Sequence, residues 1–283
     1  ELHNGCIDQT IIDEAGQIPP HQPFPLLVRS RRAMFLGDPW QLEPIVSLSD
    51  SDKDLYRAKA FFARQLTDAD YDCYSPTAVS AYHRAAGGSG RVGNLGDGII
   101  LKYHYRSVPQ IARFISQLCY PEMIIKTLVS PSRLGANLIA CHVEGQYIDH
   151  VNQSEIEVVK VLIKELLEAG YWLNSNSNLD NIGVISPYRR QADALNNSLR
   201  SRWSDFSSNS IGTVHTFQGG QKSVIILSTR QCHLKDSLWF INRRPNLLNV
   251  AVSRARELFI LVGNLKLLRE GEYSKLLVEY IEQ

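Results

Sequence analysis

The sequence has few cysteines and no long apolar run, and both shortages exclude classes of protein. Its five cysteines are scattered over 283 residues and none belongs to a C-x-x-C pair, which excludes a disulfide-rich miniprotein and argues against a zinc ribbon or a thioredoxin site. No stretch approaches the roughly 18 apolar residues of a membrane span, and no basic segment precedes an apolar run as in a secretory signal. We therefore expect no membrane contact, reduced thiols and a cytoplasmic protein, or a nuclear one in a eukaryote.

An excess of charge of one sign is also missing. Thirty Lys and Arg against 29 Asp and Glu leave a net charge of +1, so contacts with nucleic acid must come from local basic patches rather than from a bulk field. With 44% hydrophobic and 21% charged residues, the composition is that of an ordinary globular chain. The length predicts about two domains.

Short apolar segments alternate with amphipathic ones, which is typical of an α/β fold. We expect strands over residues 9–15, 31–38, 99–105, 181–188, 223–230 and 257–264. We expect helices from Pro109 onward, over 190–203 and, as a closing helix, over 265–282. The nearly continuous apolar runs of the last two strands predict a parallel sheet that is covered on both faces.

One further helix is marked by its ends, and a domain boundary by its glycines. Ser154 and Glu157 have the spacing of a capping box, and Gly170 stands where the glycine after a helix is expected. Six glycines between residues 87 and 98 predict a mobile loop. The predicted domains are therefore residues 1–97 and 98–283.

Two carboxylates follow the first strand directly. Asp13 and Glu14 come after the apolar run Thr10–Ile12, and in an α/β sheet the carboxyl ends of the strands form the ligand crevice. An Asp there can hold Mg²⁺, and a neighbouring Glu can orient or deprotonate an attacking water. The alternative is an acidic turn that caps the next helix.

A second strand end has the same form. Gly37 and Asp38 follow the apolar segment 33–36 and allow a tight turn. The amide of Gln41 can donate to a terminal phosphate oxygen and accept from a water molecule. The alternative is an ordinary turn with Gln41 in solvent.

Taken together with later segments, these strand ends resemble the motifs of superfamily 1 helicases, in the branch of the nonsense-decay helicases. IIDEAGQ and FLGDPWQLEPI resemble motifs II and III, and LKYHYRS resembles motif IV. VISPYRRQ resembles the nucleic-acid-facing segment of the second motor domain, TVHTFQGGQKSVIILS resembles motif V and LLNVAVSRAREL resembles motif VI. The resemblance implies RecA-like parallel sheets flanked by helices, as one partial and one complete lobe. It also implies the C-terminal motor portion of an ATP-dependent DNA or RNA helicase or translocase that moves 5′-to-3′ on single strands.

Carried over by motif, the resemblance implies roles in ATP hydrolysis. Asp13 would coordinate Mg²⁺ and Glu14 would be the catalytic base. Arg106 and Arg254 would be arginine fingers, because a planar and always charged guanidinium can bridge two phosphate oxygens. Further nucleotide contacts would come from Asp38, Gln41, Gly219, Gln221 and Arg256. The alternatives are a surface salt bridge for Arg106 and a helix-face charge for Arg254.

The same resemblance implies nucleic-acid contacts from two segments, namely Ser186, Pro187, Tyr188 and Arg189 in one and His215 and Thr216 in the other. Tyr188 would stack on a base or pack as a core aromatic, and His215 can also be a purely structural residue. The chain departs from the family at Gln221, where Glu is common, and at Ser253, where Thr is frequent.

A phosphate loop of the form G-x-x-x-x-G-K-[ST] is missing. The chain begins Glu1-Leu2-His3 and its first methionine is Met34, so we expect the phosphate loop in a preceding part of a longer protein. Without that loop, the chain alone is not expected to hydrolyse ATP at a useful rate. The competing hypotheses are a catalytically inert module that binds nucleic acid or protein, and an ATP-driven remodeller or nuclease partner that never separates strands.

Overall fold

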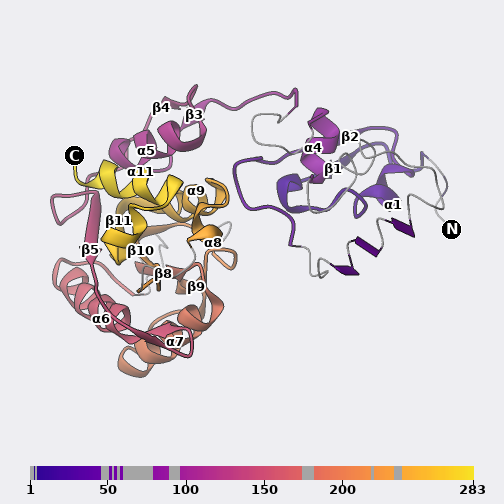
Figure 1. Cartoon of the computed structure of the whole chain (residues 1–283). Helices are drawn as coiled ribbons and strands as arrows, with labels where there is room; N and C mark the ends of the chain where they lie inside the picture. Colours follow the sequence, from indigo (N-terminus) through magenta and orange to yellow (C-terminus); the bar gives the residue numbers. More distant parts are fainter. Residues whose placement is uncertain are drawn as a thin grey trace. The chain divides into compact units, whose positions relative to one another are not determined.

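A computed structural model describes residues 3, 5–45, 51–52, 54–55, 58–59, 79–88, 96–173, 182–217, 220–232 and 238–283. The chain forms two compact units, a first unit Glu1–Leu101 and a second unit Lys102–Gln283, both drawn in Figure 1. The division falls a few residues after the boundary that the glycines predict. Much of the predicted loop lies outside the described residues.

The first unit is built around a short parallel strand pair, β1 (Thr10–Ile12) and β2 (Ala33–Phe35). Both strands are shorter than the segments 9–15 and 31–38 that the sequence predicts. The first one ends early because the chain turns into a 3-10 helix, η1 (Ala15–Gln17). A small apolar cluster forms next to these strands, with Ile12, Ala15 and Ala81 as its buried members.

Helices α1 (Phe24–Leu27) and α4 (Ala81–Ala86) also belong to the first unit. Ser80 and His83 cap the start of α4 reciprocally, and the N–H of Ala81 donates to Ile18 at 2.7 Å. This contact holds α4 next to the turn that follows β1.

The second unit contains a five-stranded sheet in the order β5-β11-β10-β8-β9, and every neighbouring pair in it is parallel. The strands are β5 (Leu138–His142), β8 (Ile182–Ser186), β9 (Ile211–Thr213), β10 (Lys222–Ser228) and β11 (Ala255–Gly263). All five residues of β8 are buried. A buried central strand requires cover on both faces of the sheet, and the helices provide it.

Helices lie on both faces of this sheet (Figure 1). Helices α6 (Gln153–Glu168) and α7 (Arg189–Arg202) cover one face, where Ile226 and Ile260 enter the main apolar core. The intervening residues of the same strands point to the other face, which is covered by α5 (Pro109–Cys119), α9 (Asn246–Ser253) and α11 (Glu272–Ile281). The predicted α/β class, with a parallel sheet flanked by helices, is confirmed.

Smaller elements surround the sheet. Of the predicted strand 99–105, only β3 (Tyr103–His104) forms, and it pairs in parallel with β4 (Ile124–Ile125). Strands β6 (Tyr147–Ile148) and β7 (Val151–Asn152) form an antiparallel hairpin. The remaining elements are η2 (Ser208–Ser210), α8 (Trp239–Asn242) and α10 (Leu265–Leu268).

The ends of α6 correct one prediction and confirm another. The cap is Asn152 and not Ser154, because the Asn152 side chain accepts from the N–H of Glu155. At the other end, Gly170 has a φ of 86°. The next N–H, of Tyr171, returns to the carbonyl of Leu166 at 2.9 Å, so Gly170 is the predicted glycine after the helix.

The closing helix is two helices, and the prediction of one continuous helix over 265–282 was wrong. The chain breaks at Gly271, between α10 and α11. Asn242 causes the break, because its Oδ1 accepts from the N–H groups of Tyr273 and Ser274, each at 2.8 Å. A side chain from a different segment thus caps the start of α11.

Gly263, the last residue of β11, allows a close approach that a larger residue would prevent. A Cβ added there would overlap Oγ1 of Thr229 and lie 3.2 Å from its Cβ. We expect Gly263→Ala to lower the free energy of unfolding by about 1–3 kcal/mol, as overpacking usually does. Urea unfolding of this variant, of Thr229→Ala and of the double variant measures the effect. The double variant should lose less than the sum of the single losses, and additive losses would contradict this account.

Candidate functional site

In the first unit, the parallel register of β1 and β2 places the two predicted strand ends side by side. Ile12 and Phe35, the last residues of the strands, lie opposite each other. Asp13–Glu14 therefore leaves β1 at the same edge where the chain from β2 continues to Asp38. The structure brings together the residues predicted from motifs II and III.

Hydrogen bonds hold the side chains of these two turns. Asp38 accepts from Nε2 of Gln41 at 3.1 Å and from the N–H of Trp40 at 2.9 Å. Glu14 has a positive φ of 51° and accepts from Nε2 of Gln17 at 3.0 Å. The left-handed backbone of Glu14 ends β1 and leaves its carboxylate exposed.

The side chains at this edge fit a magnesium ion that is bound partly by a protein carboxylate and partly by a phosphate of the substrate. Among the described residues, no group of three or more His, Cys, Asp or Glu side chains is placed to hold a metal ion. Mg²⁺ keeps several waters and takes only one or two carboxylates beside substrate phosphates. Asp13 is exposed and accepts one short bond, from the N–H of Glu14 at 2.8 Å, so it can supply such a carboxylate.

In the second unit, the predicted arginines gather at the N-terminal edge of the sheet, where β10 begins at Lys222 and β11 begins at Ala255. Arg254 is only 2% exposed. Its Nε donates to the carbonyl of Val250 at 3.3 Å and its Nη1 to that of Gly220 at 3.4 Å. The guanidinium therefore ties the end of α9 to the segment that enters β10.

The segment that carries Arg106 is fastened to the same edge. The hydroxyl of Ser107 donates to the carbonyl of Ala255 at 2.7 Å, and the N–H of Val108 donates to that of Arg256 at 2.8 Å. Burial, and then the charge of Arg106, lower the pKa of His104. The neutral imidazole that this favours can accept, at Nε2, the N–H of Ser107 at 3.1 Å.

Two further residues with predicted nucleotide roles, Gln221 and Arg256, lie at or near this edge. Gln221 is exposed just before β10 and Arg256 is half-buried in β11. Burial lowers the pKa of Lys222, the first residue of β10. Gly219 lies outside the described residues.

The residues predicted to face nucleic acid lie at the opposite, C-terminal edge of the sheet. Ser186 and Thr213 are the last residues of the neighbouring strands β8 and β9 and lie opposite each other. Ser186 and Pro187 are buried, whereas Tyr188 is half-buried and Arg189 is exposed at the start of α7. Arg189 pairs with Asp193 one turn later, at 3.4 Å.

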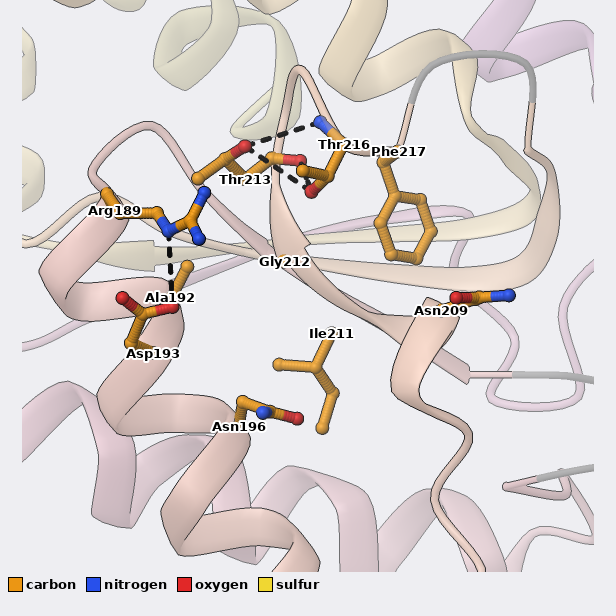
Figure 2. A pocket seen from close by; sticks show the side chains of 10 residues that line it. All are labelled: Arg189, Ala192, Asp193, Asn196, Asn209, Ile211, Gly212, Thr213, Thr216 and Phe217. Carbon is orange, nitrogen blue, oxygen red and sulfur yellow. Dashed lines mark hydrogen bonds and ion pairs between the residues drawn. The ribbon is translucent and has the colours of Figure 1, made fainter.

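Figure 2 shows a hollow between α7 and β9 that joins the two predicted nucleic-acid segments. Its volume is about 250 Å³, and Arg189 lies at one side of it and Thr216 at another. The hydroxyl of Thr216 donates to the carbonyl of Thr213 at 2.9 Å. Beside it, burial lowers the pKa of His215, which favours the neutral ring. The hollow is lined by Arg189, Ala192, Asp193, Asn196, Asn209, Ile211, Gly212, Thr213, Thr216 and Phe217.

A buried carboxylate supports this C-terminal edge, and sequence reasoning missed it. Glu155 is fully buried. Its Oε2 accepts from the hydroxyl of Ser228 at 2.5 Å and from the N–H of Arg230 at 2.9 Å, and its Oε1 accepts from Asn152 at 3.1 Å. Gln191 joins the group by donating to Ser228 at 3.0 Å. The only signal in the sequence is the spacing of Asn152 and Glu155 at the start of α6.

Burial dominates the chemistry of this carboxylate. It raises the pKa of Glu155 to about 8, against the lowering effect of the hydrogen bonds from Ser228, Arg230 and Asn152. The cost of burying the ionised carboxylate is larger than the effect of these hydrogen bonds. Glu155 therefore keeps its proton at a pH far above that at which an exposed Glu loses it.

Comparison with known proteins connects this geometry to a family. A family model described as an AAA domain matches residues 92–266, which is more than half of the chain. The chain belongs to the AAA domain family. It is similar to the probable RNA helicase armi of Drosophila melanogaster, with 27% identity over 309 residues that cover 97% of this chain and 25% of the relative. It is also similar to the helicase sen1 of Schizosaccharomyces pombe, with 28% identity over 289 residues that cover 95% and 15%.

Among solved structures, the chain is similar to the PRRSV helicase, with 15% identity and a TM-score of 0.46 over 93% of this chain and 36% of that chain. The family match and the helicase relatives confirm the resemblance that the motifs carry, to superfamily 1 helicases of the nonsense-decay branch. The chain of this AAA domain protein spans a quarter or less of the length of the two curated relatives. Among the described residues, we find no helix with the length and hydropathy that crossing a membrane requires.

Glu155 predicts a specific dependence of stability on pH. Because its pKa is about 8 in the folded chain against 4.5 ordinarily, the folded chain holds a proton between these values that the unfolded chain has lost. Its contribution to stability therefore falls as pH rises through this window. Glu155→Gln removes the titration and keeps an acceptor oxygen, so we expect stability to fall less with pH in the variant.

Urea unfolding of the parent and of Glu155→Gln at about pH 5, 6.5 and 8 measures the two slopes. His104 and His215 have lowered pKa values and act in the opposite direction, but they are present in both proteins. The difference between the slopes therefore isolates Glu155. Parallel slopes would show that Glu155 does not retain its proton on folding.

Proposed function

We propose that this chain is the motor portion of an ATP-dependent superfamily 1 helicase or translocase that moves on single-stranded DNA or RNA. One observation carries the proposal. The residues with predicted nucleotide roles in the second unit gather at the N-terminal edge of the sheet. The residues with predicted nucleic-acid roles gather at its C-terminal edge, around the hollow in Figure 2. The family supports 5′-to-3′ movement as part of the same proposal.

In the nucleotide part of the proposed function, the carboxylates and arginines have separate tasks. A bound Mg²⁺ would offset the negative charge of the ATP phosphates. Asp13 would hold this metal, and Glu14, which is exposed next to Asp13 in the chain, would orient and deprotonate the attacking water. Gln41, already fixed by its bond to Asp38, donates to a phosphate oxygen. Arg106 and Arg254 stabilise the charge that develops as the phosphoryl group transfers.

In the nucleic-acid part, backbone contacts come from the start of α7 and the segment after β9. Arg189 and Arg190 are exposed at the first turn of α7. They supply positive charge to a phosphate backbone without reading bases. Thr216 adds a hydroxyl at the rim of the hollow. The hollow, with a volume of about 250 Å³, would receive part of a nucleotide that projects from the strand.

The test of the nucleic-acid part is a double variant, Arg189→Ala with Arg190→Ala. We expect weaker binding of single strands of any base sequence. The slope of log affinity against log salt should fall by about 0.7 for each phosphate contact that is lost. Fluorescence anisotropy with labelled oligouridine and oligothymidine over a series of salt concentrations measures both quantities.

The matched control changes two arginines at the other end of the same helix, Arg200→Ala with Arg202→Ala. This control alters net charge by the same amount but leaves the edge at Ser186 and Thr213 intact. If the two double variants lose affinity and slope equally, the contacts come from bulk charge and not from the start of α7.

Arg254→Ala tests the nucleotide part, in a longer form of the protein that includes the expected phosphate loop. We expect ATP turnover at saturating nucleic acid to fall about a thousandfold, or about 4 kcal/mol of barrier, while ATP affinity changes much less. Because Arg254 also ties Val250 to Gly220, unfolding of the variant must be measured alongside. A folded variant with near-normal turnover would refute the arginine-finger role. A longer parent without ATP turnover would favour an inert binding module.

A further inference from the structure

The end of β10 presents an arginine whose conformation the sheet does not require. Among the described non-glycine residues, only Glu14, Asp149, His150 and Arg230 have positive φ, and that of Arg230 is 70°. An arginine adopts this left-handed backbone rarely, because its Cβ crowds the following carbonyl. Some interaction must therefore hold it there.

A hydrogen bond to the buried carboxylate of Glu155 holds the backbone of Arg230 in place. Its Oε2 accepts the backbone N–H of Arg230 at 2.9 Å, and a second bond, from Ser228 at 2.5 Å, fixes the same oxygen. Burying a carboxylate is costly unless it is hydrogen-bonded, and the hydrogen bonds to Glu155 come from polar groups at the C-terminal edge. The arrangement therefore fixes the backbone that leaves β10.

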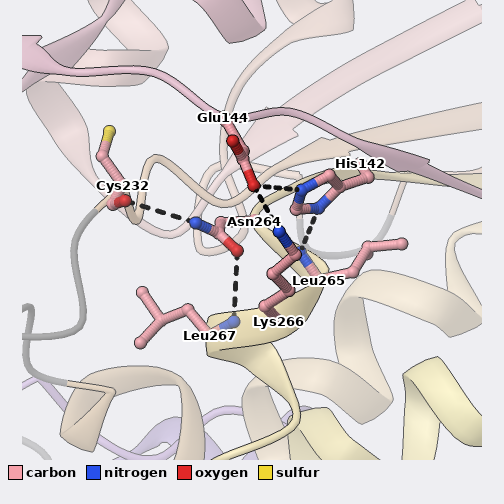
Figure 3. Close-up of polar contacts among 7 residues, drawn as sticks. All are labelled: His142, Glu144, Cys232, Asn264, Leu265, Lys266 and Leu267. Atoms are coloured by element: carbon pink, nitrogen blue, oxygen red, sulfur yellow. Dashed lines mark hydrogen bonds and ion pairs between the residues drawn. The ribbon is translucent and has the colours of Figure 1, made fainter.

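The chain after Arg230 is fastened as well. The carbonyl of Cys232 accepts from Nδ2 of Asn264 at 3.3 Å (Figure 3). Asn264 in turn caps α10 by accepting from the N–H of Leu267 at 3.2 Å. The segment Arg230–Cys232 is thus held by Glu155 at its first residue and by Asn264 at its last.

The result is a guanidinium placed against an aromatic ring. The Cζ atom of Arg230 lies 3.7 Å from the centre of the Tyr188 ring. Gln231 donates to the hydroxyl of the same tyrosine, and Phe240 lies at its side, 5.6 Å between ring centres. A stacked guanidinium directs its N–H groups outward in the plane of the fork, where phosphate oxygens bind best.

This guanidinium lies beside the predicted nucleic-acid residues. Tyr188 directly precedes Arg189 and Arg190 at the start of α7. The turn between β6 and β7 contacts arginines from both segments. Nη1 of Arg190 lies 3.5 Å from the carbonyl of Asp149. Nη1 of Arg230 lies 3.4 Å from Nδ1 of His150, the next residue of the turn. The three arginines therefore form one basic group at the C-terminal edge.

We propose that Arg230 is a further nucleic-acid-binding residue, which contacts the phosphodiester backbone of a single strand, and that Glu155 is its positioning residue. The inference rests on the proposed function, since it extends the same edge of the sheet. Glu155 touches no ligand and acts only through the backbone of Arg230.

The first experiment measures binding of labelled oligouridine and oligothymidine to Arg230→Ala. We expect about tenfold weaker binding, as for loss of one charged hydrogen bond, and a salt slope smaller by about 0.7. Arg230→Gly should behave alike while accepting the positive φ without strain. The matched control is Arg133→Ala, which removes an arginine stacked on Tyr171, at 4.7 Å, away from this edge.

The second experiment tests Glu155 with two variants of similar length. Glu155→Met has no acceptor for the N–H of Arg230, so we expect the same loss of affinity as in Arg230→Ala. Glu155→Gln keeps one acceptor oxygen and should bind within about twofold of the parent. In the Arg230→Ala background, Glu155→Met should cause no further loss, because coupled residues are not additive.

The outcomes separate this inference from the proposed function. Parental affinity and slope in Arg230→Ala would overturn the binding role of Arg230. A loss in Glu155→Met that persists undiminished in the Arg230→Ala background would overturn the positioning role. A parent chain that binds neither oligonucleotide would instead refute the proposed function. If Glu155→Met does not fold, the arginine variants still decide the first part, and Ser228→Ala, which removes one donor to Glu155, decides the second.

Discussion

The all-parallel register of the five-stranded sheet is the constraint on which both candidate edges depend. Because the strands of this sheet all run in the same direction, each of them begins at one edge of the sheet and ends at the other. Segments far apart in the sequence are therefore sorted by whether they precede or follow a strand. Arg254 precedes β11 and Tyr188 follows β8, so they lie at opposite edges. The sorting needs no specific contact between the two sets of residues.

Each edge of the sheet contains a buried charged residue, which must be stabilised by hydrogen bonds within the fold. The second unit does this differently at the two edges. At the N-terminal edge, Arg254 keeps its charge while buried because main-chain carbonyls of Val250 and Gly220 accept from it. At the C-terminal edge, Glu155 accepts hydrogen bonds but retains a raised pKa. A guanidinium cannot lose its proton at any ordinary pH, whereas a carboxylate can be neutralised, so the buried charge of Arg254 does not respond to pH and that of Glu155 does.

How far the sequence predicts this structure depends on the range of the interaction. Strands and helices with strong apolar patterns, such as β10 and α5, lie where the patterns place them, because burial on one or two faces decides them. The motif residues at strand ends follow from the same patterns. Asn152 and Ser154 are both common capping residues, and only the bond from Glu155 decides between them. Both residues satisfy the local capping preference, so the sequence alone does not choose between them.

Two features that the sequence did not predict involve partners distant along the chain. The break at Gly271 requires Asn242, which is 31 residues from Tyr273. The bond from Ser228 to Glu155 spans 73 residues. No pattern within a helix or a strand contains such pairs, because they exist only after the strand order brings the segments together. The motifs select the two edges as candidate sites, and the packed structure shows which residues hold those edges in place.

Strand β10 connects the two edges directly. Its first residue, Lys222, donates its N–H to the carbonyl of Arg254 at 3.0 Å, and two residues after its last residue stands Arg230. Six of its seven residues are buried. Because protein interiors are close-packed and have low compressibility, the strand is a rigid element. Seven strand residues span roughly 23 Å at about 3.3 Å each. The strand therefore joins the edge that carries Arg254 to the edge that carries Arg230 and Tyr188, the two edges to which the proposed function assigns the nucleotide and the nucleic acid.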